Sequence, residues 1–332
     1  MSATEQQLKT RVAALFEEKV VDLFLGYAGS DVPLKTSVFA ARTAADAKAL
    51  VWHPLCSSNL AALLPALLKR PVGLRGDWVP PRIGVLAKGC VSRSIVGLIK
   101  AHQVPREALH IVGVTCEGMI DRHRVSREVG PGEIADAELL DGKQLHVRTT
   151  DGSETTFAWA DILYTGCRTC RHRGAVLADE TIGNKATTIA DARPDETVDA
   201  FAGQPIEARW TAFREEIARC IRCYACREAC PNCYCTECFA DETSPKWIGT
   251  TTDVSDLMLF HLGRAFHQAG RCVDCGACVA ACPQGIDLRL LNQKINQDVA
   301  ALFGGEVSVS LDDPEPLLQF AMNDDEGFMT EP

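Results

Sequence analysis

The cysteine pattern between residues 220 and 282 constrains this chain more than any other feature. The run C-x2-C-x2-C-x3-C-P occurs twice, and its cysteines are Cys220, Cys223, Cys226 and Cys230, then Cys272, Cys275, Cys278 and Cys282. Three cysteines two residues apart wrap one loop around a face of an iron–sulfur cubane. The fourth cysteine, followed by proline, leaves that loop. The pattern therefore predicts two [4Fe-4S] clusters.

The fourth cysteine of each run is expected to cross to the other cluster, as in two-cluster ferredoxins. The first set of ligands is then Cys220, Cys223, Cys226 and Cys282. The second set is Cys272, Cys275, Cys278 and Cys230. The alternatives are zinc ribbons and disulfides. Structural zinc usually uses two separated pairs of ligands, which does not match two sets of four at this spacing.

Length and composition indicate how many domains the chain has, which partners it excludes and in which compartment it is found. The chain has 332 residues, 16 cysteines and a formal net charge of -10. The length suggests about two domains, and the acidic balance argues against nucleic acid as a partner. The start of the chain lacks the apolar core of an export signal, and no apolar run approaches the ~20 residues of a membrane helix. We therefore expect a protein of the reducing cytoplasm with no membrane span.

The first half of the chain predicts an α/β domain. Residues 5–25 have the spacing of an amphipathic helix, and residues 50–64 that of a loop leading into an apolar helix capped by Ser57 or Ser58. Residues 82–87 and 109–115 are expected to form parallel strands joined by a loop at 88–91 and a helix at 92–102. Cys90 and Cys116 follow these two strands, at the sheet edge where sites of parallel sheets lie. Residues 144–160 predict a hairpin.

The second half predicts a helical domain. Residues 184–206 are polar and suit a linker, and helices are expected over 207–218, 253–268 and 286–302. The residues from 311 onward form an acidic tail. The predicted organisation is an α/β domain over residues 1–205, to which the resemblance described below assigns a flavin and iron–sulfur function, an α-helical two-cluster ferredoxin domain over 206–310, and the tail over 311–332. The fold class is α/β (or α+β) followed by a small α-helical domain.

Several segments resemble a known family. Residues 88–95 (KGCVSRSI), 113–118 (GVTCEG), 167–170 (CRTC) and 178–183 (ADETIG) are similar to the beta subunits of deazaflavin (coenzyme F-420) hydrogenases and formate dehydrogenases. Residues 220–239 resemble the ferredoxin portion attached in bacterial members. The C-terminal part resembles the helical ferredoxin domains of heterodisulfide reductase and fumarate reductase subunits. The chain departs from the archaeal pattern, because its ferredoxin runs lie at the C-terminus and none lies at the N-terminus.

The resemblance, which covers roughly residues 30–300, implies cofactors and partners. In that family the first domain binds FAD and a [4Fe-4S] cluster, and passes electrons between a partner subunit and a soluble carrier. For this chain it implies a catalytic partner subunit and a carrier that is a deazaflavin, a nicotinamide or a ferredoxin. Residues of the strand–loop–helix unit would then contact the flavin: Lys88, Gly89, Ser92, Arg93 and Ser94.

Eight cysteines remain outside the two runs. Four of them lie in the segments that carry the resemblance and form the third set, a predicted third cluster: Cys90, Cys116, Cys167 and Cys170. The run C-x-C-x2-C supplies three more, Cys233, Cys235 and Cys238, which we call the trio. A fourth cluster would join the trio to Cys56, which precedes a predicted helix. The alternative is that Cys56 and the trio are free thiols.

These features predict an electron-transfer subunit of a larger oxidoreductase complex, of the formate dehydrogenase, hydrogenase or heterodisulfide reductase kind. Clusters would carry single electrons to or from a flavin, which would exchange two electrons with the carrier. The sequence has no Ser/His/Asp or paired-carboxylate constellation that would suggest other chemistry. A rival interpretation is a flavin-free iron–sulfur connector between two catalytic subunits. A weaker one is a zinc-stabilised scaffold.

Overall fold

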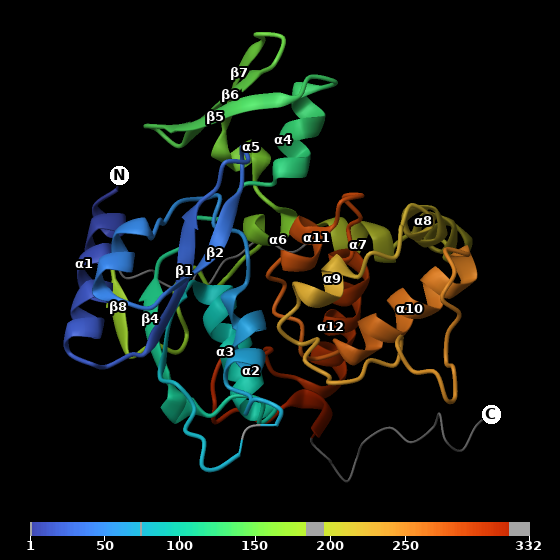
Figure 1. Cartoon of the computed structure of the whole chain (residues 1–332). Helices are drawn as coiled ribbons and strands as arrows, with labels where there is room; N and C mark the ends of the chain where they lie inside the picture. Colours follow the sequence, from blue (N-terminus) through green and yellow to red (C-terminus); the bar gives the residue numbers. More distant parts are fainter. Residues whose placement is uncertain (1, 74, 184–195, 319–332) are drawn as a thin grey trace.

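A five-stranded sheet forms the core of the first half of the chain (Figure 1). We used a computed structural model, which describes residues 2–73, 75–183 and 196–318. The strand order is β2-β1-β3-β4-β8, with β2 antiparallel at one edge and the other four strands parallel. The strands are β1 (Leu23–Gly29), β2 (Thr36–Ala41), β3 (Ile83–Ala87), β4 (Leu109–Val114) and β8 (Glu180–Ile182).

The predicted parallel pair is confirmed as β3 and β4, with Val85 opposite Ile111. All five residues of β3 are buried, because helices cover both faces of a parallel sheet. Figure 1 shows α1 (Ala3–Glu17) on one side of the sheet and α3 (Gly89–Lys100) on the other. Four short helices lie in the segments that connect the strands: η1 (Ala44–Ala49), η2 (Leu60–Leu63), α2 (Leu64–Leu67) and η3 (Arg106–Ala108).

Three helix boundaries differ from the prediction. Helix α1 ends at Glu17, because Lys19 takes the left-handed conformation (φ 55°) that stops a helix, and Leu23 begins β1. Helix α3 starts at Gly89 with Lys88 as its N-cap, so Ser92 lies inside the helix and does not cap it. The helical turn after residue 59 is capped by the side chain of Asn59, which accepts a hydrogen bond from the Ala61 amide, and not by Ser57 or Ser58.

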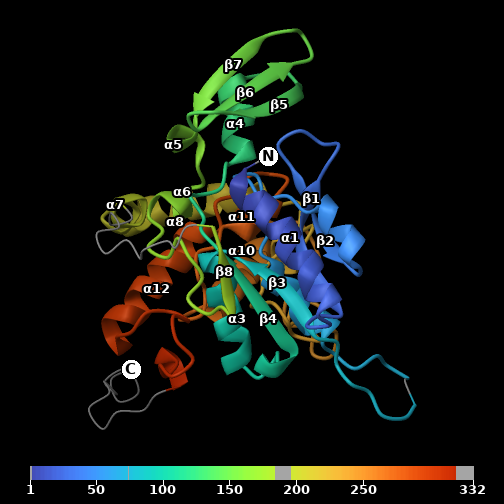
Figure 2. The same ribbon diagram turned by 90° about the vertical axis from the view of Figure 1, so that its left-hand side faces the viewer.

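A second, antiparallel sheet of three strands projects away from the first sheet in both views (Figures 1 and 2). The predicted hairpin is confirmed as β6 (Gln144–Thr149) and β7 (Glu154–Ala158), and β5 (Ile134–Leu140) pairs with β6 in addition. Helices α4 (Arg122–Val129) and α5 (Trp159–Ile162) pack beside it. Their buried side chains form a small core of their own with the sheet, which includes Val125, Leu145, Val147 and Ile162.

The C-terminal region is helical, as predicted. Its elements are α7 (Glu196–Ala202), α8 (Ile206–Ala218), α9 (Ala225–Glu228), α10 (Val254–His267), α11 (Ala277–Ala281), α12 (Arg289–Phe303) and η4 (Pro316–Leu318). Part of the segment expected to be a linker is helix α7, while residues 184–195 lie outside the described residues. The end of the acidic tail, from residue 319, lies outside them as well. None of the described helices is both long and apolar enough to cross a membrane.

The helical region packs directly against the first sheet domain. The guanidinium of Arg93 on α3 donates to the carbonyl of Val307 at 2.6 Å, and Arg122 donates to the carbonyl of Ala280 at 3.3 Å. Tyr234 and Val279 lie against the core of the sheet domain. The two halves of the molecule therefore share an interface, and the cysteines of both halves approach it.

Gly89 marks a close contact beside this interface. A Cβ added at Gly89 would lie 1.9 Å from the backbone oxygen of His172, so the 170–174 segment crosses the start of α3 at backbone contact distance. Alanine usually stabilises a helix over glycine by about 0.5–1 kcal/mol, but overpacking against backbone costs about 1–3 kcal/mol.

We predict that Gly89→Ala lowers the free energy of unfolding by about 1–3 kcal/mol, because the clash outweighs the gain in helix propensity. The measurement is the urea midpoint at unchanged m-value. The matched control is Gly29→Ala, where an added Cβ meets nothing within 4 Å. A Gly89→Ala protein as stable as the control would contradict the observed packing.

Candidate iron–sulfur sites

The first set of cysteines surrounds one small cavity in the helical region. Cys220, Cys223 and Cys226 line it from the loop that enters α9, and Cys282 lines it from the end of α11. The structure thus brings together the four residues that the crossed pattern predicts.

Polar hydrogens point at the sulfurs of this first set. The backbone amide of Arg222 lies 3.3 Å from the Cys220 sulfur, and that of Ile286 lies 3.4 Å from the Cys282 sulfur. The His261 Nε2 atom is also 3.4 Å from the Cys220 sulfur. Such donors favour thiolates over thiols. Burial lowers the pKa of His261 to about 4, so the ring is neutral and donates from Nε2 only in one tautomer.

The two cysteine runs adopt the same backbone conformation. Arg222 and Asp274 have φ of 54° at equivalent positions, and Tyr224 and Gly276 have φ of 59° and 70°. A short helix follows each left-handed turn, α9 in the first run and α11 in the second. Non-glycine residues pay an energetic cost for this conformation, so its repetition indicates a required loop shape. The repeat in sequence is therefore also a repeat in structure.

The cysteines of the second set come from the end of α9 and from the loop that enters α11, and the Gln293 amide on α12 approaches the sulfur of Cys272 at 3.7 Å. Burial raises the pKa of the Cys278 thiol to about 12, and the nearby thiols of Cys230 and Cys275 contribute to the increase. The thiols of Cys275 and Cys278 act in the same way on Cys272. The Asp274 carboxylate in this loop is held by Arg289 through two hydrogen bonds of 2.8 and 2.7 Å.

Arg264 on α10 lies between these sets, and the sequence analysis missed it. Its side chain is 5% exposed, and one of its nitrogens donates to the carbonyl of Cys226 at 3.1 Å. Burial alone would lower the pKa of the Arg264 guanidinium, but the nearby thiols of Cys278 and Cys230 raise that pKa above its usual value. Its spacing from the buried residues Leu257 and Phe260 places it on the inner face of α10. The spacing alone therefore predicts a buried position for Arg264, while its contact with the carbonyl of Cys226 depends on the tertiary structure.

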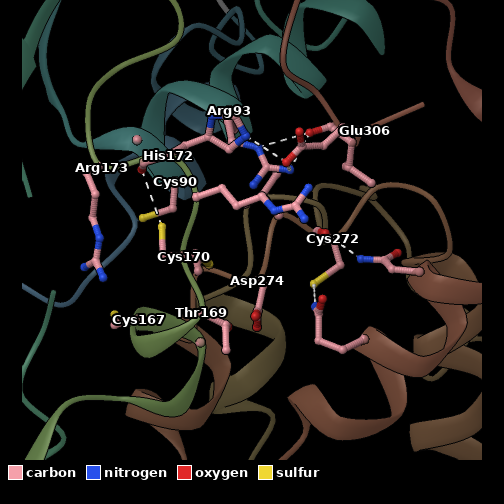
Figure 3. Close-up of a pocket in the computed structure, with 18 of the residues that line it drawn as sticks. Cys90, Arg93, Cys167, Thr169, Cys170, His172, Arg173, Cys272, Asp274 and Glu306 are labelled. Atoms are coloured by element: carbon pink, nitrogen blue, oxygen red, sulfur yellow. Dashed lines mark hydrogen bonds and ion pairs between the residues drawn. The ribbon is translucent and has the colours of Figure 1, made fainter. Parts of the chain in front are cut away.

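The third set lines a cavity of about 410 Å³ between the sheet domain and the helical region (Figure 3). Cys90 lies in the first turn of α3, directly after β3, and Cys116 follows β4. Cys167 is on α6 (Thr165–Arg168), and Cys170 follows it. The parallel strands thus deliver two sulfurs and the α6 segment delivers two more, as the sequence predicts. Cys272 and Cys275 of the second set line the same cavity.

The predicted flavin-contact residues do not all face this cavity. Lys88, Gly89 and Arg93 line it, but Ser92 and Ser94 do not. The Ser92 hydroxyl donates to the carbonyl of Gly89 at 3.0 Å and accepts from the backbone amide of Val176. The Ser94 hydroxyl donates to the carbonyl of Cys90 at 2.9 Å and accepts from the side chain of Asn59. The structure therefore does not support a cofactor contact for the two serines, whose hydrogen bonds are made inside the fold.

The charged end of Lys88 is also turned into the protein. The residue is 1% exposed, its ammonium donates to the carbonyl of Cys56, and it lies 5.5 Å from the centre of the Tyr27 ring. Burial opposes the charge, but the surrounding ionisable groups, Tyr27 and Cys90 first among them, raise the pKa of Lys88 above its usual value. The ammonium is suited to balance the negative charge of thiolates in the third set.

Cys56 is not part of the group that the sequence analysis assigned to it. Its side chain is fully buried in the apolar core of the sheet domain, with its sulfur 3.9 Å from the carbonyl of Val51. Burial raises the pKa of its thiol to about 12. The trio lines a different cavity, which Cys56 does not reach. The predicted helix after Cys56 begins only at Leu60, so it does not promote thiolate formation.

Within the described residues, no three His, Cys, Asp or Glu side chains converge as closely as a single metal ion requires. A cubane imposes a different geometry, because each thiolate binds a different iron and the four sulfurs surround a volume. The cysteines of the first set surround a cavity in this way. The first set therefore fits an iron–sulfur cluster, with thiolates as the ligands.

Comparisons with known proteins agree with these sites. A family model described as a 4Fe-4S dicluster domain matches residues 216–286, a stretch that contains the first and second sets. The beta subunit of the F420-dependent formate dehydrogenase of Methanocaldococcus jannaschii is 22% identical over 278 residues, which cover 67% of this chain and 73% of that protein. The beta subunit of the F420-dependent formate dehydrogenase 1 of Methanococcus maripaludis is 24% identical over 247 residues, covering 57% and 63%.

The resemblance stated from the sequence is thereby confirmed: the chain is similar to beta subunits of F420-dependent formate dehydrogenases and carries a dicluster region. It spans 73% of one relative and less than two thirds of the other. A solved structure of the F420-reducing [NiFe] hydrogenase complex from Methanosarcina barkeri matches 52% of this chain and 59% of that chain, at 19% identity and a TM-score of 0.34.

The crossed ligand sets predict a pattern of iron loss in double variants. Cys282→Ala should remove about four irons per chain, and adding Cys220→Ala should remove no more, because both residues serve one cluster. Adding Cys278→Ala to Cys282→Ala should remove about four further irons. The measurement is iron content after anaerobic reconstitution. An uncrossed arrangement would reverse the result, making Cys282 additive with Cys220 and not with Cys278.

Proposed function

We propose that this chain, a relative of the beta subunits of F420-dependent formate dehydrogenases, is the electron-transfer subunit of a multisubunit oxidoreductase. The observation that carries the proposal is the first set of cysteines, drawn from two distant runs and arranged around one cavity within the matched dicluster region. Bound clusters would supply one-electron redox chemistry. The domain organisation proposed for this function is 1–205, 206–310 and 311–332.

The residues of the chain have distinct roles in this proposal. The cysteine thiolates hold the iron, and the amides of Arg222 and Ile286 donate toward the sulfurs. Hydrogen bonds to cluster sulfurs tune the reduction potential. The buried guanidinium of Arg264 offsets negative charge between the first two sets. Phe260 and Ile286 form part of the wall of the first cavity and limit the access of water to it.

The third set extends these sites toward the sheet domain. The cavity that it lines is also lined by Cys272 and Cys275 of the second set. A third cluster in this cavity would therefore lie next to the second. Three neighbouring sites would give electrons a path between the helical region and the carboxyl ends of the parallel strands, where a partner or carrier can be reached. The proposed partners are a catalytic subunit and a deazaflavin, nicotinamide or ferredoxin carrier.

A flavin-free connector is the second candidate function, and one specific observation favours it. Of the five residues expected to contact a flavin, Ser92 and Ser94 are committed to hydrogen bonds inside the fold, and Gly89 packs against the His172 backbone. The residues present thus do not form the predicted flavin site. We derive no step through a flavin. FAD binding in the first domain stays a proposal that rests on the family resemblance seen in the sequence.

Cofactor analysis after anaerobic purification distinguishes a flavin-linked electron-transfer subunit from a flavin-free connector. The three sets predict at least about twelve irons per chain, with matching acid-labile sulfide. Stoichiometric FAD in the denatured extract would support the flavin-linked subunit, and iron with no flavin would support the connector. Zinc in place of iron would contradict both. Purification of the native complex then identifies the catalytic partner, and a chain isolated with no redox subunit would contradict the role in a complex.

A further inference from the structure

The trio lines a cavity that the first three sets do not use. This cavity has a volume of about 550 Å³ and is bounded by the 227–241 segment and by α10 and the residues that follow it. Its volume lies within the range of about 300–1,000 Å³ that is usual for small-molecule and cofactor sites. Cys233, Cys235 and Cys238 all line it, and no other cysteine of the described chain does.

Three arginines line the same cavity: Arg227, Arg264 and Arg271. Arg264 approaches Cys233, and its Nε atom is buried with no hydrogen-bond partner in the structure. Arg227 approaches Cys238. A buried donor without a partner costs free energy, so the cavity is built to receive an acceptor or an anion. Guanidinium groups beside thiols favour the thiolate form and offset the charge of an anionic group.

The loop that carries the trio is fixed on both sides. Asn232 donates from its side chain to the carbonyl of Arg271 at 2.8 Å, and Arg227 forms an ion pair of 2.6 Å with Asp241. Thr236 accepts a hydrogen bond of 3.4 Å from Lys69 of the sheet domain. The three sulfurs are therefore presented by an anchored segment, which distinguishes them from loose surface thiols.

One side chain connects the trio to the second set. Gln268 is 2% exposed. Its amide nitrogen lies 3.7 Å from the sulfur of Cys233, and its amide oxygen lies 3.6 Å from the sulfur of Cys230. Cys230 belongs to the second set, so any group held by the trio lies next to the second cluster site.

We propose that Cys233, Cys235 and Cys238 bind a fourth [4Fe-4S] cluster through three thiolates, and that its fourth iron has no protein ligand. The spacing C-x-C-x2-C places three thiolates on one loop, as cubanes require, and no other cysteine lines the cavity. Cys230, whose thiol hydrogen-bonds to that of Cys233, is expected to serve the second cluster. His267 also lines the cavity, but its ring packs against that of Phe239, with 5.0 Å between the ring centres. An iron without a protein ligand is open to solvent or to a small anion. The inference goes beyond the proposed function, which needs only the first three sets.

An open iron has a chemical signature. A one-electron oxidant such as ferricyanide takes one electron from the [4Fe-4S]2+ core, which then releases the open iron as Fe2+ and leaves [3Fe-4S]+. Ferrous iron and a reductant reverse the conversion. Clusters held by four thiolates lose iron more slowly under the same oxidation, because each of their irons is bound to the protein, so a limited amount of oxidant distinguishes the two kinds of cluster.

The test uses the full chain, reconstituted anaerobically with iron and sulfide. Cys235→Ala should lower the iron content by about four per chain, while Cys56→Ala and His267→Ala should leave it unchanged. Cys235 is exposed, so its replacement does not disturb the core. Ferricyanide should generate one [3Fe-4S]+ electron paramagnetic resonance signal per chain in the wild type and in Cys56→Ala, and none in Cys235→Ala.

Several results would overturn the proposal. Cys235→Ala with wild-type iron content would show that the trio holds no cluster. Iron loss in Cys56→Ala or in His267→Ala would assign the fourth iron to that residue. One zinc per chain that is lost in Cys235→Ala would make the trio a zinc site. Each of these leaves the iron of the first two sets in place, so failure here differs from failure of the proposed function, in which that iron is missing.

Discussion

The helical region is organised around two equivalent loops, and Cys282 from the end of the second loop lies with the cysteines of the first. Each loop turns through two left-handed residues, Arg222 and Tyr224 in one and Asp274 and Gly276 in the other, before a short helix leads to its last cysteine. In this way α9 and α11 are brought against each other. The surrounding helices α8, α10 and α12 then enclose thiols that would otherwise be exposed to water. The positions of the cysteines and the packing of the surrounding helices therefore depend on each other.

Bringing the cysteines together also concentrates negative charge when they are thiolates. Enclosing many thiolates in one region is costly unless cations are enclosed with them. Arg264 and Lys88 are two buried cations that meet this need, one among the helices and one beside the sheet. Arg264 contacts the first set through the carbonyl of Cys226 and faces the cavity of the trio. A single guanidinium thus lies next to three groups of cysteines and couples their electrostatics.

The sequence predicted these features to different degrees, for physical reasons. The parallel strands β3 and β4 follow from short motifs, whose geometry is determined within a few residues, and so does the placement of Cys220, Cys223, Cys226 and Cys282 around one cavity. The grouping of Cys56 with the trio was wrong, because it rested on counting leftover cysteines across distant segments, and burial of Cys56 depends on the whole sheet domain. Ser92 and Ser94 were assigned from a helix start placed three residues late. The role of Arg264 needed the tertiary structure.

Magnetic coupling between clusters tests the central claim most directly. If the first and second sets hold two adjacent clusters, electron paramagnetic resonance of the fully reduced chain will show signals broadened and split by spin–spin interaction, and the half-reduced chain will show a simple signal. A Cys278→Ala variant should retain the simple signal of the cluster held by the first set at full reduction. Fully reduced wild-type protein that shows only independent, non-interacting signals, or no iron–sulfur signal, would contradict the account.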